Sequence, residues 1–392
     1  SGGGPMRLEG RNRWWLMGMA WFVALNLRAA PISVSPILPL IRSDLGLSYA
    51  QAGFLFALPI LMMGVFGLVG GRLADTVGIK GTISLGLAAI LVGGALRTLA
   101  SGYLLLAIWT MMLGAGIGIA SPGLTRMVKD RFSDLPGTAT GIYTNGLAVG
   151  AIIGPWLTVP YLLEWSGAWR GTFLVWSGVA LLALLGWVGV APSGVAPAGA
   201  RPPALSGIWR DPTVWKMNLI LLSQNLVFYS LAAWIPTYCR DLGFTLERGT
   251  LVLTVFLLAS LPGSLLLPYF SDRMGGRRSN IIGAGAVLLV TLIGFAFYPL
   301  AVPWVYMLVF GVSIGGLLGL IFALPLDYVR AERVGSVAGA NFLVGYGGAF
   351  LGPLVMGWIH DVTASFTAGW IVLVPVVSAL IGLAASLPRK PA

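Results

Sequence analysis

The sequence predicts an all-α membrane protein whose twelve transmembrane helices form two pseudo-symmetric six-helix bundles. Three observations predict this fold. Of the 392 residues, 57% are apolar and only 9% are charged, twelve long apolar runs divide the chain, and its two halves repeat. Soluble domains carry about 25% charged residues. The composition therefore excludes a soluble enzyme and a disordered chain.

The net charge of +11 could suggest a nucleic-acid partner. The 24 lysines and arginines are scattered among short loops, however, so they form no basic face and we expect no nucleic-acid partner. Cys239 is the only cysteine in the sequence and His360 the only histidine, which leaves no intramolecular disulfide and makes a metal site improbable. We expect no metal and no cofactor.

Twelve continuous apolar runs are long enough to span a bilayer, which takes about 20 residues. Strands of a membrane barrel would alternate apolar and polar residues, and these runs do not. The first run is too long for a signal-peptide core and lacks a cleavage site, whereas residues 1–5 resemble a cloning remnant before a natural start at Met6. The predicted helices cover residues 14–40, 49–73, 80–99, 102–126, 138–160, 170–191, 215–238, 249–270, 279–299, 303–327, 335–358 and 366–387.

Loop charges predict the orientation, because cytoplasmic loops of membrane proteins are rich in lysine and arginine. With the N-terminus inside, 18 of the 24 basic residues fall on the cytoplasmic side and five on the other. We therefore expect a multi-pass protein of a prokaryotic cytoplasmic (inner) membrane, with both termini cytoplasmic. A monomer is expected.

The two halves match at a nearly constant offset of about 197 residues, which indicates an internal duplication. The matches are residues 39–46 with 236–243, Asp75 with Asp272, and Gly154-Pro155 with Gly352-Pro353 after one inserted residue. Such repeats place a substrate site near the bilayer midplane between the halves. The predicted organisation is a cytoplasmic N-terminus (1–13), a first bundle (14–191), a cytoplasmic linker (192–214), a second bundle (215–387) and a cytoplasmic tail (388–392).

Short motifs now connect the chain to a known family. Residues 71–80, GRLADTVGIK, closely resemble the signature of the loop between helices two and three of the major facilitator superfamily, and residues 271–278, SDRMGGRR, resemble its second copy. Residues 26–28 (NLR), 224–229 (QNLVFY) and 234–236 (WIP) resemble the cyanate-permease and nitroimidazole-transporter branch. The resemblance implies a secondary transporter that works by alternating access, and no enzyme.

The chain departs from the superfamily pattern in helix four, where Thr110 stands in place of an arginine that the family often uses in proton coupling. The sequence also places no Asp or Glu in the middle of a predicted helix. A carboxylate proton relay is therefore not expected. Uptake of an anion against an inside-negative potential would need a proton carried with the substrate or an exchanged anion.

Arg28 is the most informative residue, because it lies about halfway along the first predicted helix. An arginine there costs roughly 2.5–3.5 kcal/mol and lies too deep to reach either interface easily. Its guanidinium offers a fork of donors suited to carboxylates and small oxyanions. We interpret Arg28 as an anion-binding residue; the alternative is a structural arginine bonded to helix carbonyls.

Position 225 is equivalent to Arg28 at the 197-residue offset, and Asn225 and Tyr229 share one helix face. We expect both to line the substrate site, with Gln224 and Trp234 as further candidates. Hydrogen bonding between helices is the alternative for all four. Together with Arg28 they favour a small anionic substrate.

Other residues are assigned to helix packing and conformational change. Pro31 and Pro36 predict a kink after Arg28, either a gating bend or a static one. Gly146, Gly150 and Gly154 predict a close-packing face. Asp75 and Asp272 resemble the family's cytoplasmic latch aspartates, although topogenic charge is the alternative. Arg131, a cation on the same side, is grouped with them.

The leading prediction is therefore a secondary active transporter of a small anion, similar to cyanate, nitrate, nitrite or a small carboxylate. The alternative is an efflux transporter for neutral or aromatic molecules such as nitroimidazoles or drugs. The sequence leaves the direction of transport and the coupling ion open.

Overall fold

The structure, a computed structural model, describes residues 10–192, 208–274 and 276–388. In this part of the chain, twelve helical spans are long and apolar enough to cross a membrane. The predicted all-α membrane fold with twelve spans is confirmed. The expected cloning remnant, the start at Met6, most of the linker (192–214) and most of the tail (388–392) lie outside the described residues.

The first six spans are built from eight α-helices and two short irregular turns. They are α1 (Gly10–Ile32), α2 (Val34–Leu45), α3 (Tyr49–Thr76), α4 (Gly78–Leu96), η1 (Arg97–Leu99), α5 (Tyr103–Arg131), α6 (Pro136–Leu157), η2 (Thr158–Leu163), α7 (Glu164–Ser166) and α8 (Trp169–Val190).

The first span is longer than expected and is divided into α1 and α2 at Ser33. Pro31 and Pro36 have no backbone N–H, so the carbonyls of Leu27 and Ile32 lose their usual helical donors. The break remains tied together, because the Ser33 N–H donates to the carbonyl of Ala29 at 3.0 Å. The Ser33 hydroxyl donates to the carbonyl of Ala30, also at 3.0 Å.

The fifth span extends six residues beyond the expected end at 160, through the π-helical turn η2 and the short helix α7. Pro160 lies inside η2 and cannot donate the regular helical hydrogen bond, so the backbone widens locally. Thr158 anchors the turn: its hydroxyl donates to the Gly154 carbonyl at 2.6 Å and accepts from the Trp176 indole at 3.1 Å.

The other six spans begin after a short 3₁₀ turn, η3 (Ile208–Arg210). They are α9 (Pro212–Asp241), α10 (Leu246–Met274), α11 (Arg277–Phe297), α12 (Pro303–Tyr328), α13 (Ala331–Thr363) and α14 (Phe366–Ala385). Helix α9 begins three residues earlier than expected, because Asp211 caps it by accepting the Thr213 N–H at 2.8 Å and Pro212 occupies its first position.

The described residues fall into two compact units. One contains residues 10–40 and 58–192, and the other contains residues 41–57, 208–274 and 276–388. The end of α2 and the start of α3 (residues 41–57) therefore belong to the second unit, although their sequence lies in the first repeat. In the first unit the buried core includes Leu16, Met17 and Trp187.

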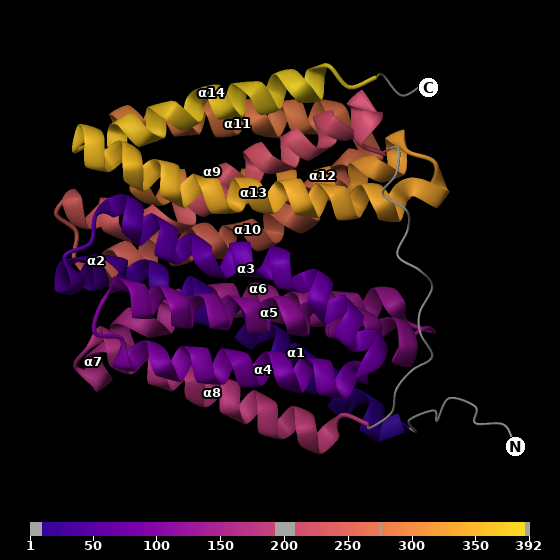
Figure 1. Cartoon of the computed structure of the whole chain (residues 1–392). Helices are drawn as coiled ribbons and strands as arrows, with labels where there is room; N and C mark the ends of the chain where they lie inside the picture. The colour runs from indigo at the N-terminus through magenta and orange to yellow at the C-terminus, as the bar shows by residue number, and fades with distance from the viewer. Residues whose placement is uncertain (1–9, 193–207, 275, 389–392) are drawn as a thin grey trace, which may run out of the picture. The chain divides into compact units, whose positions relative to one another are not determined.

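Several pairs of helices pack backbone against backbone within the units, among them α1 with α6 and α9 with α13, which are labelled in Figure 1. A Cβ atom added at Gly150 would lie 2.1 Å from the Leu25 carbonyl oxygen, and one at Gly348 would lie 2.1 Å from that of Leu222. Leu25 and Leu222 are 197 residues apart, so the duplication predicted from the sequence is present in the packing. Gly146 and Gly154 also face α1, as expected for a close-packing face.

Candidate functional site

Arg28 is half-buried in the first unit, on the last turns of α1 before the break at Ser33. Its chain neighbours Leu27 and Ala29 are 1% and 0% exposed. The carbonyl of Ala29 faces Gly154 of α6, where an added Cβ would approach to 2.7 Å. The glycine contact thus holds the backbone beside Arg28 rigidly, while the following proline-rich segment ends the regular helix.

Asn225 occupies the equivalent position on α9 in the second unit and is half-buried as well. Its amide Nδ2 donates to the carbonyl of Gly345 on α13 at 3.1 Å. Tyr229, one turn further along α9, is 3% exposed, and its ring meets that of Phe228 edge to face at a centroid distance of 5.0 Å.

Gln224 is 1% exposed, and its Nε2 donates to the carbonyl of Ile314 on α12 at 3.3 Å. No described residue donates to its Oε1. A buried amide oxygen without a donor is costly, so Gln224 is a polar group that a ligand or a water molecule would satisfy.

Trp234 is placed differently from the other three residues predicted on α9. Its side chain is fully buried, and its indole N–H donates to the carbonyl of Pro353 at 3.0 Å. The Tyr49 and Phe366 rings lie 5.8 Å and 5.4 Å away. These contacts give Trp234 a packing environment between α9, α13 and the start of α3.

Two buried asparagines lack hydrogen-bond partners. Asn26 on α1 and Asn218 on α9 are both 0% exposed, and no described residue bonds either polar atom of their amides. Asn26 belongs to the motif at residues 26–28, whereas no sequence motif pointed to Asn218. Interhelical polar contacts and small-molecule contacts both satisfy such groups in membranes.

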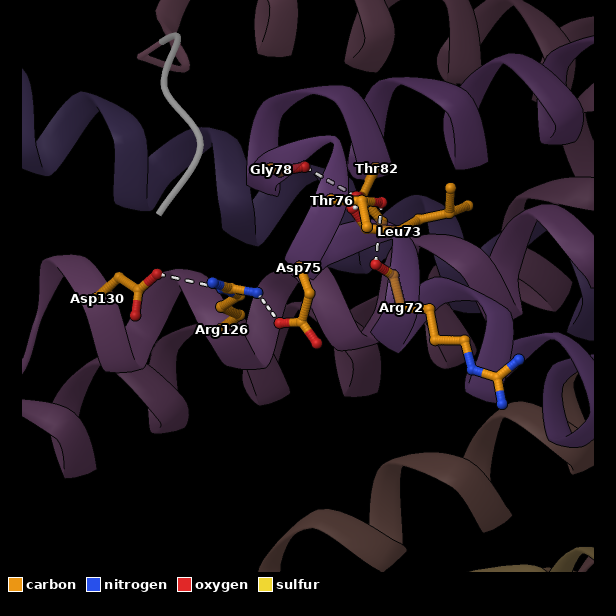
Figure 2. A network of polar contacts seen from close by, with 8 residues as sticks. All are labelled: Arg72, Leu73, Asp75, Thr76, Gly78, Thr82, Arg126 and Asp130. Atoms are coloured by element: carbon orange, nitrogen blue, oxygen red, sulfur yellow. Dashed lines mark hydrogen bonds and ion pairs between the residues drawn. The ribbon is translucent and has the colours of Figure 1, made fainter. Parts of the chain in front are cut away.

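The first unit carries a cluster of charges around Asp75, where α3 ends (Figure 2). The Arg126 guanidinium pairs with Asp75 through Nη1 and lies 3.3 Å from Asp130 through Nε. Arg72 points away from Asp75 in this view (Figure 2). Arg126 is 12% exposed, so the pair is stronger than a fully exposed one. The sequence pattern singled out Arg131, the last residue of α5, and missed Arg126.

The turn beside this cluster is shaped by hydrogen bonds and by a glycine whose backbone is in the left-handed region (Figure 2). The Thr76 hydroxyl donates to the Arg72 carbonyl at 3.1 Å, and the Thr82 hydroxyl donates to that of Gly78 at 2.8 Å. Gly78 has φ +83°, a conformation that favours glycine. The turn between α3 and α4 therefore holds Asp75 at the end of its helix.

The second unit has a corresponding cluster at Asp272. Arg277 on α11 donates to Asp272 at 3.1 Å and pairs with Asp327 of α12 at 2.6 Å. Arg277 thus joins two carboxylates from two different helices. Asp272 and Asp327 correspond to Asp75 and Asp130 at the offset of 197, but the arginine that joins them comes from a different helix.

Comparison with known proteins agrees with this architecture. A crystal structure of the nucleoside transporter NupG matches the chain with a TM-score of 0.81, covering 97% of this chain and 100% of that one at 11% identity, which shows a shared fold. The 2-nitroimidazole transporter of Escherichia coli (strain K12) is 30% identical over 98% of both chains. The cyanate transport protein CynX of the same strain is 27% identical over 89% of this chain and 90% of its own.

The family model for the Major Facilitator Superfamily matches residues 15–353. This match spans most of both repeats, including Arg28, Asn225 and the two charge clusters. It agrees with the resemblance seen in residues 71–80 and 271–278. The chain is a multi-pass membrane transporter of small molecules and not an enzyme, and it belongs to the Major Facilitator Superfamily.

Proposed function

We propose that the protein is a secondary active transporter of a small anion and that Arg28 binds the anion. The observation that carries this proposal is a half-buried arginine in the middle of a membrane span, between fully buried neighbours and just before a proline-induced break. Arginine at such depth is costly and usually functional. Its planar fork of donors suits cyanate-like, nitrate-like or carboxylate groups.

Polar residues of the second unit support the same substrate class. Asn225, at the position equivalent to Arg28, and Gln224, with its unsatisfied oxygen, offer amide groups, and Tyr229 offers a phenol. We include these three in the proposed substrate site. Trp234 is left out of it, because its indole N–H is already bonded to Pro353 in a packed interior.

The similarity to CynX supports the anionic substrate, because cyanate is an anion. The similarity to the 2-nitroimidazole transporter favours a second candidate function, the export of neutral or aromatic small molecules. The two functions differ in their need for the Arg28 charge. A neutral aromatic substrate that binds equally well without Arg28 would favour the second.

The conformational cycle is part of the proposal. We expect alternating access in which Asp75, Asp272 and Arg131 act at the cytoplasmic ends and the break near Pro31 and Pro36 permits bending. The charge distribution supports cytoplasmic termini in an inner membrane. The proposal also includes bundles at 14–191 and 215–387 and a monomeric protein. Anion uptake would require a proton carried by the substrate or an exchanged anion, since each charge costs about 2.3 kcal/mol per 100 mV.

Thermal-shift binding of the purified protein tests the proposal. The ligands are cyanate, nitrate, nitrite, small carboxylates, aromatic acids and neutral 2-nitroimidazole. We expect one anion class to raise the melting temperature of the wild-type protein and to have no effect on Arg28→Ala. Stabilisation by 2-nitroimidazole alone, unchanged in Arg28→Ala, would contradict anion binding at Arg28.

Arg97 provides a matched control for the loss of a buried arginine. It is 1% exposed, and its guanidinium lies 4.0 Å from the centre of the Phe173 ring. Arg97→Ala should lower the melting temperature of the free protein, because a packed side chain is lost, and should leave the anion-induced rise unchanged. Uptake into proteoliposomes should follow the same pattern among the three proteins.

A further inference from the structure

The N-terminus of α3 receives a carboxylate from a helix more than 300 residues away in sequence. Oδ1 of Asp361, near the end of α13, accepts the backbone N–H of Tyr49 at 2.8 Å, and Oδ2 accepts that of Ala50 at 2.8 Å. The first N–H groups of a helix have no partners inside the helix, and negative charge is favourable there. Each oxygen of Asp361 therefore satisfies one exposed donor.

Helix α3 also has a local cap that does not involve Asp361. The Gln51 N–H donates to the Ser48 hydroxyl at 3.2 Å, and the Ser48 N–H donates to Oε1 of Gln51 at 2.9 Å. This reciprocal pair is a capping box. Because the local cap is independent of α13, Asp361 is not needed to start α3, and its contribution is to hold α3 against α13.

Close packing surrounds these two hydrogen bonds. A Cβ added at Gly357 would lie 2.3 Å from the Tyr49 carbonyl oxygen, and one added at Gly53 would lie 2.2 Å from the Pro353 carbonyl oxygen. The Tyr49 ring lies 3.7 Å from that of His360, and the Arg42 guanidinium lies 4.1 Å from the Tyr49 ring centre. Residues 41–57 are thus docked on the second unit by shape as well as by charge.

We propose that Asp361 and the N-terminus of α3 form a releasable latch that holds residues 41–57 on the second unit. These residues are covalently continuous at both ends with the first unit, which includes residues up to 40 and from 58 onward. Any movement that separates the outer ends of α2 and α3 from α13 must break both Asp361 hydrogen bonds. This inference goes beyond the proposed function, and it requires no statement about the substrate.

The strength of the contact suits a latch that opens repeatedly. Asp361 lies at an exposed end of its helix, where a carboxylate at a helix N-terminus has a modest effect that salt screens. Loss of its charge should change the ratio of undocked to docked segment by about twofold to fivefold. The glycine contacts remain and continue to guide the segment back.

Spin-label distance measurements test the latch in the full-length protein without substrate. Labels at Ser43→Cys and Val302→Cys, in a Cys239→Ala background, report the distance between the docked segment and the outer loop of the second unit. Ser43 and Val302 are exposed. We expect Asp361→Ala to raise the ratio of long to short distances about twofold to fivefold. Asp361→Asn, which keeps one acceptor oxygen, should fall between it and the unmodified latch.

Two further variants separate a latch from a purely structural role. Glu247→Gln removes an exposed carboxylate at the start of α10, and it should leave the distances unchanged. Ser48→Ala breaks the local cap, so it should lower the melting temperature more than Asp361→Ala does. An Asp361→Ala protein with the unmodified distance distribution, or a Glu247→Gln protein with the same shift as Asp361→Ala, would overturn the proposal.

Discussion

The helix pairs α1–α6 and α9–α13 have the same backbone packing and different polar side chains. The glycine contacts fall at equivalent positions of the two repeats, as the following pairs show: Gly150 with Leu25, Gly154 with Ala29, Gly348 with Leu222, and Gly352 with Leu226. At the neighbouring equivalent positions the first pair carries Arg28 and the second carries Asn225, which is bonded to Gly345. The duplicated packing is therefore a frame, and the chemistry that we propose lies where the repeats have diverged.

The charge clusters around Asp75 and Asp272 differ in another way. Both keep their two aspartates at equivalent positions, but Arg126 of α5 joins the first pair and Arg277 of α11 joins the second. The position equivalent to Arg277 is Lys80, and the position equivalent to Arg126 is Ala323. The requirement common to both clusters is thus a guanidinium between two carboxylates, and the helix that supplies it is free to change.

The largest expected effect concerns the shared frame. Gly150→Ala and Gly348→Ala each place a methyl group against a backbone carbonyl, so one helix must shift, which costs about 1–3 kcal/mol by analogy with overpacked cores. Both variants should lose several degrees of melting temperature. Gly141→Ala and Gly347→Ala, where an added Cβ meets nothing within 4 Å, are the matched controls on α6 and α13. Equal melting temperatures for all four would show that the glycine contacts are not what holds the pairs together.

A second prediction tests whether the helix that supplies the arginine matters. Arg126→Ala leaves Asp75 and Asp130 close together without their shared cation. This should lower stability by about 1–2 kcal/mol, toward the low end for hydrogen bonds to charged groups because both aspartates are partly exposed. Adding Lys80→Arg places a guanidinium at the position that Arg277 occupies in the second repeat. The double variant should recover part of the melting temperature. No recovery would mean that the two clusters are not interchangeable.

The smallest effect is expected for the exposed aspartates. Asp75→Asn and Asp272→Asn remove carboxylates whose side chains are 48% and 63% exposed, and exposed pairs contribute about 0–1 kcal/mol. Each arginine keeps its second partner, Asp130 or Asp327. We expect small changes in stability and a shift in the conformational populations measured by distances between spin labels placed near the two charge clusters. An unchanged population in Asp75→Asn would remove the latch role proposed for that residue.

Much of the fold could be predicted from the sequence, because spans, repeat and proline break depend on local patterns. Continuous apolar runs fixed the twelve spans, and Pro31 and Pro36 indicated the break that the structure places at Ser33. The π-helical turn at Pro160 was not predicted, since the run of apolar residues continues past it. The missing donor at Pro160 was the available signal.

Contacts distant in sequence were harder to predict. In the sequence, Asp361 is an ordinary charged residue at the end of a predicted helix. Its hydrogen bonds to Tyr49 and Ala50 depend on how α13 packs against α3. Arg126 and Arg131 lie on the same helix, so only the placement of α3 shows that Arg126 pairs with Asp75. Trp234 lies in a motif that suggested a role in substrate binding. Only its hydrogen bond to the Pro353 carbonyl indicates that it packs between helices instead.

The proposed anion site at Arg28 is tested most directly by the dissociation constants of the stabilising anion, measured by calorimetry for the wild-type protein, Arg28→Gln, Arg28→Lys and Asn225→Ala. A charge-assisted hydrogen bond contributes about 1.5–3 kcal/mol and a neutral one about 0.5–1.5 kcal/mol. Arg28→Gln should therefore weaken binding by about 10- to 150-fold, and Asn225→Ala by roughly 10-fold or less. Arg28→Lys should fall between, since it keeps the charge and loses the fork. Wild-type affinity for every anion in Arg28→Gln would contradict the proposed site.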